Sequence, residues 1–600
     1  MKNLAWKRDV DPEEKFGRRI NILWVGIICA FLLLLVRIGW LQLGEGERYR
    51  YLSENFRLQL LPLPAPRGLI LDRNGEKLAE NEACFSVAVV PCNVNNPDEL
   101  LNSLPRSLHI DRELAKRKIQ EAINPFRPVS LIKKGVDMST ITFLLEREEE
   151  FPGTVVLTHP VRHYPYHNIA SHLLGHIGEV NQKELSMNFI PGVEAGDLVG
   201  KMGIERVYNE YLQGKKGGRQ IEVDAYGRPL RTISERDASP GNNVYLSIDI
   251  KLQEIAEREL GERKGAVVIG DPYTGKILAL VSHPNFDPNL FARGISEENW
   301  VRLKQDPENP LQNRAVRGEY APASTFKIIV AAAALESHKI NEKETFLCKG
   351  ELRVGNRIFR CWKEGGHGRL NLEGAIIHSC DVFFYQLGLR IGVDRIIEFA
   401  HLFGLGRPTG IDLVSEGKGL LPSPSWKLRN KGEAWYGGDT ANLSIGQGYI
   451  LVTPLQMLGV ISAIANGGKL FKPYLVEKIV DPRGRVIKEF FPHRVGKVPL
   501  SPSTLSILRR ALRGVVREGT GWRAENKVVE ISGKTGTAEF PGGERPHNWF
   551  IGYAPSDNPS LAIVVLVEHR KEDISIAAEI TGKILSQWFG KGVETTSSPS

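Results

Sequence analysis

A long apolar run near the start of the chain dominates its pattern of hydrophobic and polar positions. Residues 22–36 contain no charged or strongly polar side chain, and after Arg37 the apolar pattern continues to Leu43. A helix of this length spans roughly 33 Å, enough to cross the hydrocarbon core of a membrane. The run therefore predicts a transmembrane anchor at residues 22–43. A cleaved signal peptide is the alternative, but the run is long and no small-residue cleavage motif follows it.

Positive charges around this run predict its orientation. Six Lys and Arg residues precede it, and three occupy the twenty residues after it. Under the positive-inside rule, residues 1–21 are a cytoplasmic tail and the bulk of the chain lies outside the cytoplasm. The sequence contains no second apolar run of comparable length, so the pattern predicts a single-pass protein.

Residues 44–240 have a mixed pattern that predicts a domain of their own. The proline-rich stretch 61–66 predicts an extended connection, and residues 67–75 predict a strand that ends in an Asn-Gly turn. Residues 97–160 are charged and predict helix, and a further helix is expected near 203–212.

Residues 241–590 predict an α+β domain whose antiparallel sheet is built from both of its ends. The expected strands are 243–248, 265–271, 276–282, 528–531, 549–554 and 561–568, and the expected terminal helices are 249–262 and 574–589. Helical and glycine-rich segments are inserted between the two groups of strands, an arrangement typical of α+β folds. Residues 591–600 form a polar tail.

Composition narrows the class of protein. The chain has 600 residues, of which 42% are hydrophobic and 25% charged. These values exclude a disordered, collagen-like or multi-span membrane protein. The net charge of +8 is spread along the chain and is too dilute to indicate nucleic-acid binding. Six cysteines cannot make a disulfide framework for a chain of this size.

Three motifs in the second domain carry candidate chemistry. The first, Ser324-Thr325-Phe326-Lys327, follows Pro322, so a helix that starts there places the lysine one turn from the serine. A neutral lysine can take the proton of a serine hydroxyl and make it nucleophilic. The second motif is Ser379-Cys380-Asp381. The third is Lys534-Thr535-Gly536-Thr537, on a strand expected at the sheet edge. Each motif alone is weak, but the three in this order are specific.

In this order the motifs resemble those of the penicillin-binding, serine-acyltransferase superfamily. The chain is most similar to class B penicillin-binding proteins, in particular the elongation-type penicillin-binding protein 2 subfamily. Supporting stretches outside the three motifs are Arg67-Gly68, Asp72-Arg73-Asn74-Gly75, Arg162-His163-Tyr164-Pro165, Gly203-Ile204-Glu205, Asp224-Ala225-Tyr226-Gly227-Arg228, Gly446-Gln447-Gly448 and Thr453-Pro454-Leu455-Gln456.

The resemblance covers nearly the whole chain and implies its architecture. Residues 44–240 would be a non-catalytic, dimerisation-type pedestal domain, and residues 241–590 a transpeptidase domain with a β-lactamase-like fold. The protein would be anchored in the bacterial inner membrane, with its bulk in the periplasm. No pattern of a class A glycosyltransferase is present, so polymerisation of glycan is not expected from this chain.

The resemblance also implies D,D-transpeptidation of peptidoglycan stem peptides through a serine acyl-enzyme, inhibited by β-lactams. Ser324 would attack the D-Ala-D-Ala carbonyl, with Lys327 as its general base. Ser379 would relay a proton to the leaving amine, and Lys534 would keep the site electropositive. A stem-peptide amine would then release the donor as a cross-link.

Substrate binding is assigned by the same resemblance. Thr535 and Thr537 would hold the substrate carboxylate, and Gly536 would allow a substrate strand to approach closely. Backbone N–H groups of Ser324 and Thr537 would form the oxyanion hole, in which one donor contributes about 3–4 kcal/mol.

The second motif departs from the family pattern, because Asp381 stands where Asn is usual. A carboxylate near Lys327 favours the charged lysine and opposes its action as a neutral base. Either Asp381 is engaged elsewhere, or the proton route differs from the pattern.

Cys348, Cys361, His367 and Cys380 form a candidate zinc site within 33 residues. Three thiolates and an imidazole suit tetrahedral zinc, although the spacings are wider than those of a zinc finger. A disulfide between Cys348 and Cys361 and a set of free thiols are the alternatives. Relatives in the subfamily can carry a metal here; the zinc would be structural, and no cofactor is expected for catalysis.

Other functions and partners follow from the same comparison of motifs. A D,D-carboxypeptidase or β-lactamase, both hydrolases, would differ only in using water as acceptor. A penicillin sensor or scaffold that activates a partner polymerase is a third hypothesis, and a role in division or sporulation stays open beside elongation.

The resemblance implies a SEDS-family, RodA-like glycosyltransferase and an MreC-like scaffold as partners, and no nucleic acid.

Overall fold

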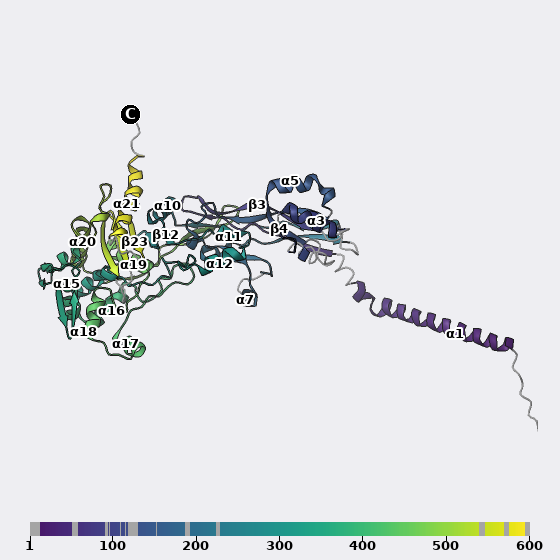
Figure 1. Ribbon diagram of the computed structural model, residues 1–600, viewed down its shortest axis with the longest axis horizontal. Helices are drawn as coiled ribbons and strands as arrows, with labels where there is room; N and C mark the ends of the chain where they lie inside the picture. The colour runs from purple at the N-terminus through teal and green to yellow at the C-terminus, as the bar shows by residue number, and fades with distance from the viewer. Residues whose placement is uncertain are drawn as a thin grey trace, which may run out of the picture. The chain divides into compact units, whose positions relative to one another are not determined.

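A computed structural model gives the fold of the chain (Figure 1). It describes residues 12–50, 58–89, 94, 97–108, 110–113, 116–117, 130–151, 153–186, 193–223, 229–538, 546–568 and 575–594. The predicted tail residues 1–11, the motif Asp224–Arg228 and the polar residues 595–600 lie outside these ranges. The chain divides into a smaller unit, made of residues 1–64, 85–159 and 216–238, and a larger unit, made of residues 65–84, 160–215 and 239–600.

The predicted membrane anchor is helical. Helix α1 (Pro12–Gly39) continues into a π-helical turn, Trp40–Gly44. Residues 17–44 make the one helix in the described part of the chain that is long and apolar enough to cross a membrane. Its apolar side chains are exposed, as expected for side chains that face lipid. The helix fits a single-pass membrane anchor.

The smaller unit contains a three-stranded antiparallel sheet and a separate α/β cluster. The sheet has the order β1-β8-β9, with β1 (Leu58–Leu63), β8 (Gly217–Val223) and β9 (Pro229–Arg236). The cluster consists of the second part of β3 (Lys77–Val89), α3 (Pro97–Leu108), β4 (Ser130–Val136), α5 (Met138–Glu146), the 3₁₀ turn Glu148–Glu150 and the first part of β5 (Thr154–His163). Its core is apolar and includes Val87, Leu104, Ile132 and Leu144.

The prediction of helix across residues 97–160 is wrong in part. Strand β4 pairs antiparallel with the second part of β3, and β5 begins within the predicted range. Ile132 and Val136 of β4 are buried, and β5 opens with the β-branched run Thr154-Val155-Val156. Burial and β-branched side chains therefore prevail over the high content of charged residues.

In the larger unit, one sheet has the order β19-β18-β10-β2-β3. Its strands are β2 (Ile70–Leu71), the first part of β3, β10 (Asn243–Leu246), β18 (Val476–Val480) and β19 (Val486–Glu489). Strand β10 runs parallel to β2, and the other pairs are antiparallel. The expected strand and turn at residues 67–75 are present.

Three of the sequence stretches typical of the family meet in one buried ion cluster. Glu205 accepts hydrogen bonds from Arg67 Nε at 2.7 Å and from Arg162 Nε at 2.6 Å. Burial alone would raise the pKa of Glu205, but the two guanidinium groups lower it. Arg162 also donates to the carbonyl of Gly68 at 2.7 Å. The cluster ties together segments that are far apart in the sequence.

Replacement of Arg162 by Lys is expected to lower the free energy of unfolding by about 1–3 kcal/mol, because an ammonium cannot reach both Glu205 and the Gly68 carbonyl. Urea denaturation of the chain in detergent measures the change, and Arg219→Lys, at an exposed pair with Glu235, is the matched control. An equal effect of the two variants would contradict the prediction.

The stabilisation by Glu205 is present above the unfolded-state pKa of about 4.3 and is lost as the pH falls toward the lowered pKa.

The second sheet of the larger unit is five-stranded and antiparallel, with the order β12-β11-β23-β22-β21. Its strands are β11 (Gly265–Gly270), β12 (Ile277–His283), β21 (Ser532–Ala538), β22 (His547–Ala554) and β23 (Leu561–Val567). It joins both ends of the predicted domain, and this confirms the α+β fold class.

Helices cover both faces of this sheet. Helices α10 (Ile250–Leu260) and α21 (Ile576–Glu594) pack on one face, and α19 (Pro454–Asn466) packs on the other (Figure 1). Successive residues of β23 alternate between the two cores: Ile563 and Val565 face α10 and α21, and Val564 and Leu566 belong to the other core. Such alternation is the signature of a sheet buried on both faces.

The strand predicted at residues 528–531 is wrong, because β21 begins at Ser532. The side chain of Asn526 accepts hydrogen bonds from the backbone N–H groups of Val528 and Val529, both at 3.0 Å. This local turn takes the backbone donors that a strand would need, despite the β-branched side chains.

The remaining elements of the larger unit are short strand pairs and helices. The strand pairs are β6 (Ile177–Glu179) with β7 (Leu198–Gly200), β13 (Thr345–Cys348) with β16 (Gly368–Asn371), β14 (Glu351–Val354) with β15 (Arg357–Arg360), and β17 (Lys469–Phe471) with β20 (Arg494–Lys497). The helices are α6 (Ser171–Leu174), α7 (Gln182–Ser186), α8 (Gly203–Val207), α9 (Asn209–Leu212), α11 (Asn289–Ala292), α12 (Glu297–Gln305), α13 (Lys327–Glu336), α14 (Leu372–Ile377), α15 (Asp381–Ile391), α16 (Val393–Leu402), α17 (Pro424–Lys431), α18 (Gly437–Ser444) and α20 (Pro502–Arg517), with 3₁₀ turns at Ala323–Phe326 and Trp522–Ala524.

Candidate active site

The predicted nucleophile lies in a tight turn that opens a buried helix. Ser324 is half-buried in the 3₁₀ turn Ala323–Phe326, and α13 begins directly after it at Lys327. Ala323 has a left-handed backbone with a φ of +50°. Gly446 packs so closely on this turn that a Cβ atom there would lie 2.2 Å from the Ala323 carbonyl oxygen. The turn thus holds the serine at a fixed place on the sheet.

Three motifs that are far apart in the sequence meet in one cleft of about 1440 Å³. The predicted catalytic and substrate-binding residues that line it are Ser324, Ser379, Asp381, Thr535, Gly536 and Thr537, and the predicted metal ligand Cys361 lines it as well. Lys327 and Lys534 are fully buried beneath this surface. Trp362 and Thr520 also line the cleft, but sequence reasoning missed both of them. The position of Trp362 next to the candidate metal ligand Cys361 was a signal for it, whereas no feature of the sequence marks Thr520.

Lys327 is held by the second motif. Its Nζ donates to Asp381 Oδ1 at 2.7 Å, to the Ser379 carbonyl at 2.9 Å and to Ser379 Oγ at 3.3 Å. An ammonium has three N–H donors, and all three are satisfied here. The arrangement is that of a charged lysine paired with a carboxylate.

Asp381 is therefore at the lysine and not engaged away from it. Its Oδ1 accepts from Lys327, and its Oδ2 accepts the backbone N–H of Trp362 at 3.1 Å. Of the two alternatives that the sequence left open, this geometry favours a proton route that differs from the usual pattern. Ser379 has a left-handed φ of +52°, a backbone strain of a kind that clusters at functional sites.

Lys534 lies on β21, the edge strand of the five-stranded sheet. Complete burial, and then the charge of Lys327, lower its pKa well below the usual range, and the opposing effect of Asp381 is smaller. Within the described residues, its Nζ donates a hydrogen bond to the Thr535 carbonyl at 3.2 Å. The lowered pKa favours the uncharged amine at Lys534.

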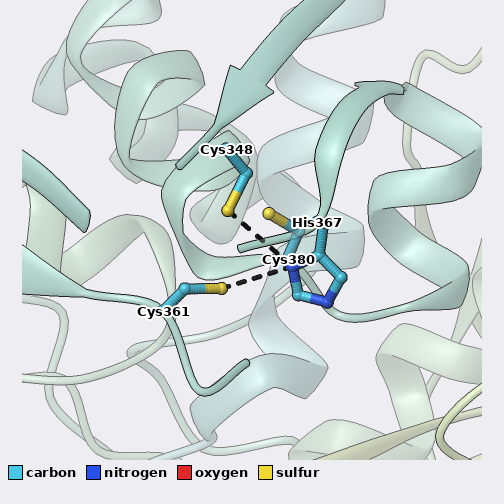
Figure 2. A group of neighbouring side chains, drawn as sticks. All are labelled: Cys348, Cys361, His367 and Cys380. Atoms are coloured by element: carbon cyan, nitrogen blue, oxygen red, sulfur yellow. Dashed lines mark hydrogen bonds between the residues drawn. The ribbon is translucent and has the colours of Figure 1, made fainter. Parts of the chain in front are cut away.

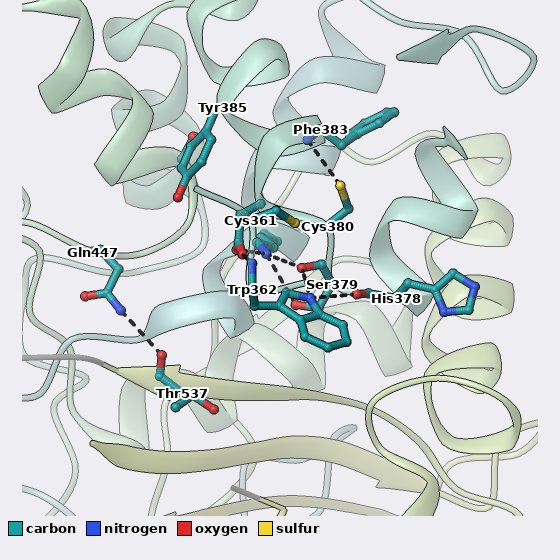
Figure 3. Close-up of polar contacts among 12 residues, drawn as sticks. Cys361, Trp362, His378, Ser379, Cys380, Phe383, Tyr385, Gln447 and Thr537 are labelled. Atoms are coloured by element: carbon teal, nitrogen blue, oxygen red, sulfur yellow. Dashed lines mark hydrogen bonds and ion pairs between the residues drawn. The ribbon is translucent and has the colours of Figure 1, made fainter. Parts of the chain in front are cut away.

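The third motif touches the nucleophile turn directly. A Cβ atom at Gly536 would lie 3.1 Å from the Pro322 carbonyl oxygen and 3.1 Å from Thr325 Cγ2, so glycine lets the strand and the turn pack closely. Thr535 Oγ1 is 2.6 Å from Thr520 Oγ1. The Thr537 carbonyl accepts from Gln447 Nε2 at 3.4 Å (Figure 3). The hydroxyl-bearing residues Thr520, Thr535 and Thr537 thus line one wall of the cleft.

The four candidate metal ligands come together beside the cleft (Figure 2). Cys348 ends β13, Cys361 follows β15, His367 precedes β16 and Cys380 caps α15. Their potential ligand atoms all lie within 4.8 Å of one another. His367 Nδ1 is 3.8 Å from Cys348 Sγ and 3.5 Å from Cys361 Sγ.

These distances fit a tetrahedral zinc site. Zinc–sulfur bonds of about 2.3 Å and zinc–nitrogen bonds of about 2.0 Å put neighbouring S and N ligands about 3.5 Å apart. A contact with Cys380 lowers the pKa of Cys361 to about 4, and the same contact raises the pKa of Cys380. Cys348, Cys361 and Cys380 are not joined by a disulfide, so the alternative of a Cys348–Cys361 bridge is not what the structure has.

Comparisons with known proteins cover almost the whole chain. The penicillin binding protein transpeptidase domain matches residues 265–586, and the penicillin-binding protein dimerisation domain matches residues 62–246. The peptidoglycan D,D-transpeptidase MrdA of Acinetobacter baumannii is 34% identical over 97% of this chain and 89% of its own length. Stage V sporulation protein D of Bacillus subtilis is 33% identical over 95% of this chain and 84% of its own length.

Two solved structures agree with these relatives. One is a complex between a penicillin-binding protein (PBP2) and MreC from Helicobacter pylori, with 31% identity, a TM-score of 0.77, and coverage of 89% of this chain and 99% of the other. The second describes the coordination of polymerization and crosslinking by a peptidoglycan synthase complex, with 30% identity, a TM-score of 0.72, and coverage of 95% and 98%. The predicted domain limits, 44–240 and 241–590, stay a prediction.

Proposed function

The chain belongs to the penicillin-binding proteins that join a dimerisation domain to a transpeptidase domain, and from this membership we propose that it is a peptidoglycan D,D-transpeptidase of cell elongation. The observation that carries the proposal is the meeting of Ser324, the Lys327–Asp381 pair and β21 in one cleft. Relatives named D,D-transpeptidase MrdA, similar over nearly their full length, support the reaction and the elongation role.

Acylation would proceed from Ser324. Its Oγ attacks the carbonyl carbon of the D-Ala-D-Ala bond, and the hydroxyl proton passes to the buried amine of Lys327. The backbone N–H groups of Ser324 and Thr537 hold the oxyanion. Ser379 Oγ, 3.3 Å from Lys327 Nζ, then donates its proton to the leaving D-Ala amine and takes in its place the proton that Lys327 received; the acyl group stays on the Ser324 oxygen.

The paired state of Lys327 sets a condition for this step. A lysine whose three donors are satisfied cannot accept a proton, so the pair with Asp381 must first give up a proton or loosen. A substrate carboxylate bound by Thr535 and Thr537 adds a negative charge near Lys534. That charge favours protonation of Lys534, the other amine in the site, and so supplies a place for the proton.

The acceptor decides between a transpeptidase and a hydrolase. Incubation of the chain with glycan strands that carry pentapeptide stems should release D-Ala and give cross-linked dimers, measured by mass spectrometry of the digested product. Release of D-Ala with tetrapeptide products alone would favour the carboxypeptidase alternative. Failure to release D-Ala in a chain that is folded and metal-replete would favour the scaffold or sensor alternative.

We also propose that Cys348, Cys361, His367 and Cys380 hold a structural zinc ion. The metal would tie the β14–β15 hairpin to the start of α15, beside Ser379 and Asp381. It would contribute to folding and orientation, and Ser324 and Lys327 would carry the chemistry without it.

Removal of this metal is expected to lower the melting temperature of the chain. Elemental analysis should find about one zinc per chain, and Cys348→Ser should lose the metal and melt at least about 5 °C lower, since a bound structural zinc contributes several kcal/mol. Cys29→Ser, in the anchor helix, is the control and should keep both properties. Equal zinc content in the two variants would sink the proposal.

Location and partners follow from the family. The apolar helix at residues 17–44 would anchor the chain in the cell membrane, with the tail in the cytoplasm and both domains in the periplasm. One of the similar structures is a complex with MreC, and another is of a peptidoglycan synthase complex that coordinates polymerization and crosslinking. We therefore assign to this chain an MreC-like scaffold and a SEDS-family glycosyltransferase as partners.

A further inference from the structure

Trp362 occupies an unusual place for a large aromatic residue. It follows Cys361 at the wall of the cleft, and 59% of its surface is exposed. A tryptophan this exposed contributes little to the core, yet both of its N–H groups are engaged. Its backbone N–H donates to Asp381 Oδ2 at 3.1 Å, and its indole Nε1–H lies 3.1 Å from the His378 carbonyl and 3.2 Å from the Ser379 carbonyl (Figure 3).

These contacts fall on the same acceptors that Lys327 uses. The Ser379 carbonyl accepts from both the Trp362 indole and Lys327, and the two oxygens of Asp381 are divided between the Trp362 backbone and Lys327. Trp362 therefore fixes the direction of the carbonyl and of the carboxylate that face the lysine.

The backbone that Trp362 holds is strained. Ser379 has a φ of +52°, a conformation that is unfavourable for a residue with a side chain and that persists only where its surroundings enforce it. The indole N–H lies within hydrogen-bonding distance of the His378 carbonyl, which precedes the strained residue, and of the carbonyl of Ser379 itself. Loss of that bond would let Ser379 relax, and its hydroxyl and carbonyl would shift relative to Lys327.

We propose that Trp362 is a positioning residue for acylation, which holds the second motif in place through its indole N–H. The inference rests on the proposed function, because its readout is the formation of the acyl-enzyme at Ser324. It assigns the effect to the hydrogen bond and not to contact of the exposed ring with substrate.

Two variants separate the N–H from the ring. Trp362→Phe keeps an aromatic ring and removes the donor. In Trp362→His, the imidazole Nε2 takes the place of the indole nitrogen, because both lie two bonds from Cγ in a five-membered ring. This variant therefore keeps an N–H at that position and removes the benzo ring. Trp300 on α12 is 41% exposed, does not line the cleft and has no side-chain hydrogen bond within the described residues, so Trp300→Phe is the matched control.

The measurement is stopped-flow acylation of the full chain in detergent by a fluorescent penicillin over a range of concentrations. This separates the acylation rate constant from the dissociation constant of the first complex. We expect Trp362→Phe to lower the rate constant about tenfold with an unchanged dissociation constant, and Trp362→His to recover most of it. Trp300→Phe should stay within about twofold of wild type.

Each contrary result has a distinct meaning. A normal rate constant for Trp362→Phe overturns the inference, and so does an equal loss in Trp362→His and Trp362→Phe. A change only in the dissociation constant would assign Trp362 to substrate contact instead. Melting temperature and zinc content are also measured for each variant. If Trp362→Phe lowers either property and Trp362→His does not restore it, that result also counts against the inference. If wild type itself forms no acyl-enzyme, the proposed function fails, and not this inference.

Discussion

Replacement of Ser324 by Ala is expected to abolish covalent labelling of the chain by penicillin. The β-lactam carbonyl needs an oxygen nucleophile in the 3₁₀ turn, and alanine supplies none. Loss of a nucleophile in enzymes of this kind lowers the rate by at least about 10³-fold, so no adduct should form within hours. Fluorescent penicillin on a denaturing gel measures the label, and mass spectrometry of the peptide that contains Ser324 locates it.

A second serine variant tests whether the label is specific. Ser337 follows the end of α13, where its hydroxyl contacts the Ala333 carbonyl, and it does not line the cleft. Ser337→Ala should label like wild type. Ser379→Ala should still label, but about 10²-fold more slowly, because it removes a proton relay and leaves the nucleophile.

The outcome separates a protein that forms an acyl-enzyme from a scaffold that does not. An adduct on Ser324 that is absent from Ser324→Ala fits acyl-enzyme chemistry. An adduct that persists in Ser324→Ala, or that maps to Ser379, would show that a different hydroxyl reacts. Absence of any adduct in a folded wild-type chain would make the protein a non-acylating scaffold, and the charged pair of Lys327 with Asp381 would be the first explanation to test.

Much of the catalytic fold is predictable because its signals are local. The hairpin of β11 and β12 follows from two apolar runs around Pro272–Gly275, and the edge position of β21 follows from the order of the strands. The helix start at Ser324 follows from Pro322. Such features depend on residues that are close in sequence.

The features that sequence reasoning missed or left open depend on contacts between distant segments. The burial of Lys534 and the pairing of Lys327 with Asp381, 54 residues apart, are set by how the strand, the turn and α15 meet. Trp362 was missed because its role rests on carbonyl groups, which every residue has. In the pedestal segments, the sequence stretches with Arg67, Arg162 and Glu205 are recognisable, but nothing local indicates that one carboxylate holds both arginines.

The role of Lys327 is the prediction for which this pairing matters most. Replacement of Lys327 by Ala is expected to lower the acylation rate constant by about 10²–10⁴-fold, the usual contribution of a general base. The variant also leaves the carboxylate of Asp381 without its partner, so some of the loss could come from a shifted second motif. Alanine alone therefore does not separate base catalysis from charge pairing.

Lys327→Arg separates the two effects. A guanidinium keeps a positive charge and two or more N–H donors for Asp381 and Ser379, but it cannot lose a proton near neutral pH and so cannot act as a base. We expect Lys327→Arg to melt closer to wild type than Lys327→Ala does and yet to acylate about as slowly. Stopped-flow acylation and calorimetry of the same samples measure the two properties.

A fast Lys327→Arg variant would overturn the assignment of the base. Acylation within about tenfold of wild type would mean that position 327 needs only a positive charge to pair with Asp381. The proton of Ser324 would then require another acceptor, and Lys534 is the one other fully buried lysine among the described residues, with a pKa lowered by burial and by the charge of Lys327. In that case Lys534→Arg would show the large loss of acylation rate, since its guanidinium cannot accept a proton. If Lys327 is the base, Lys534→Arg should instead lower the acylation rate less than Lys327→Arg does.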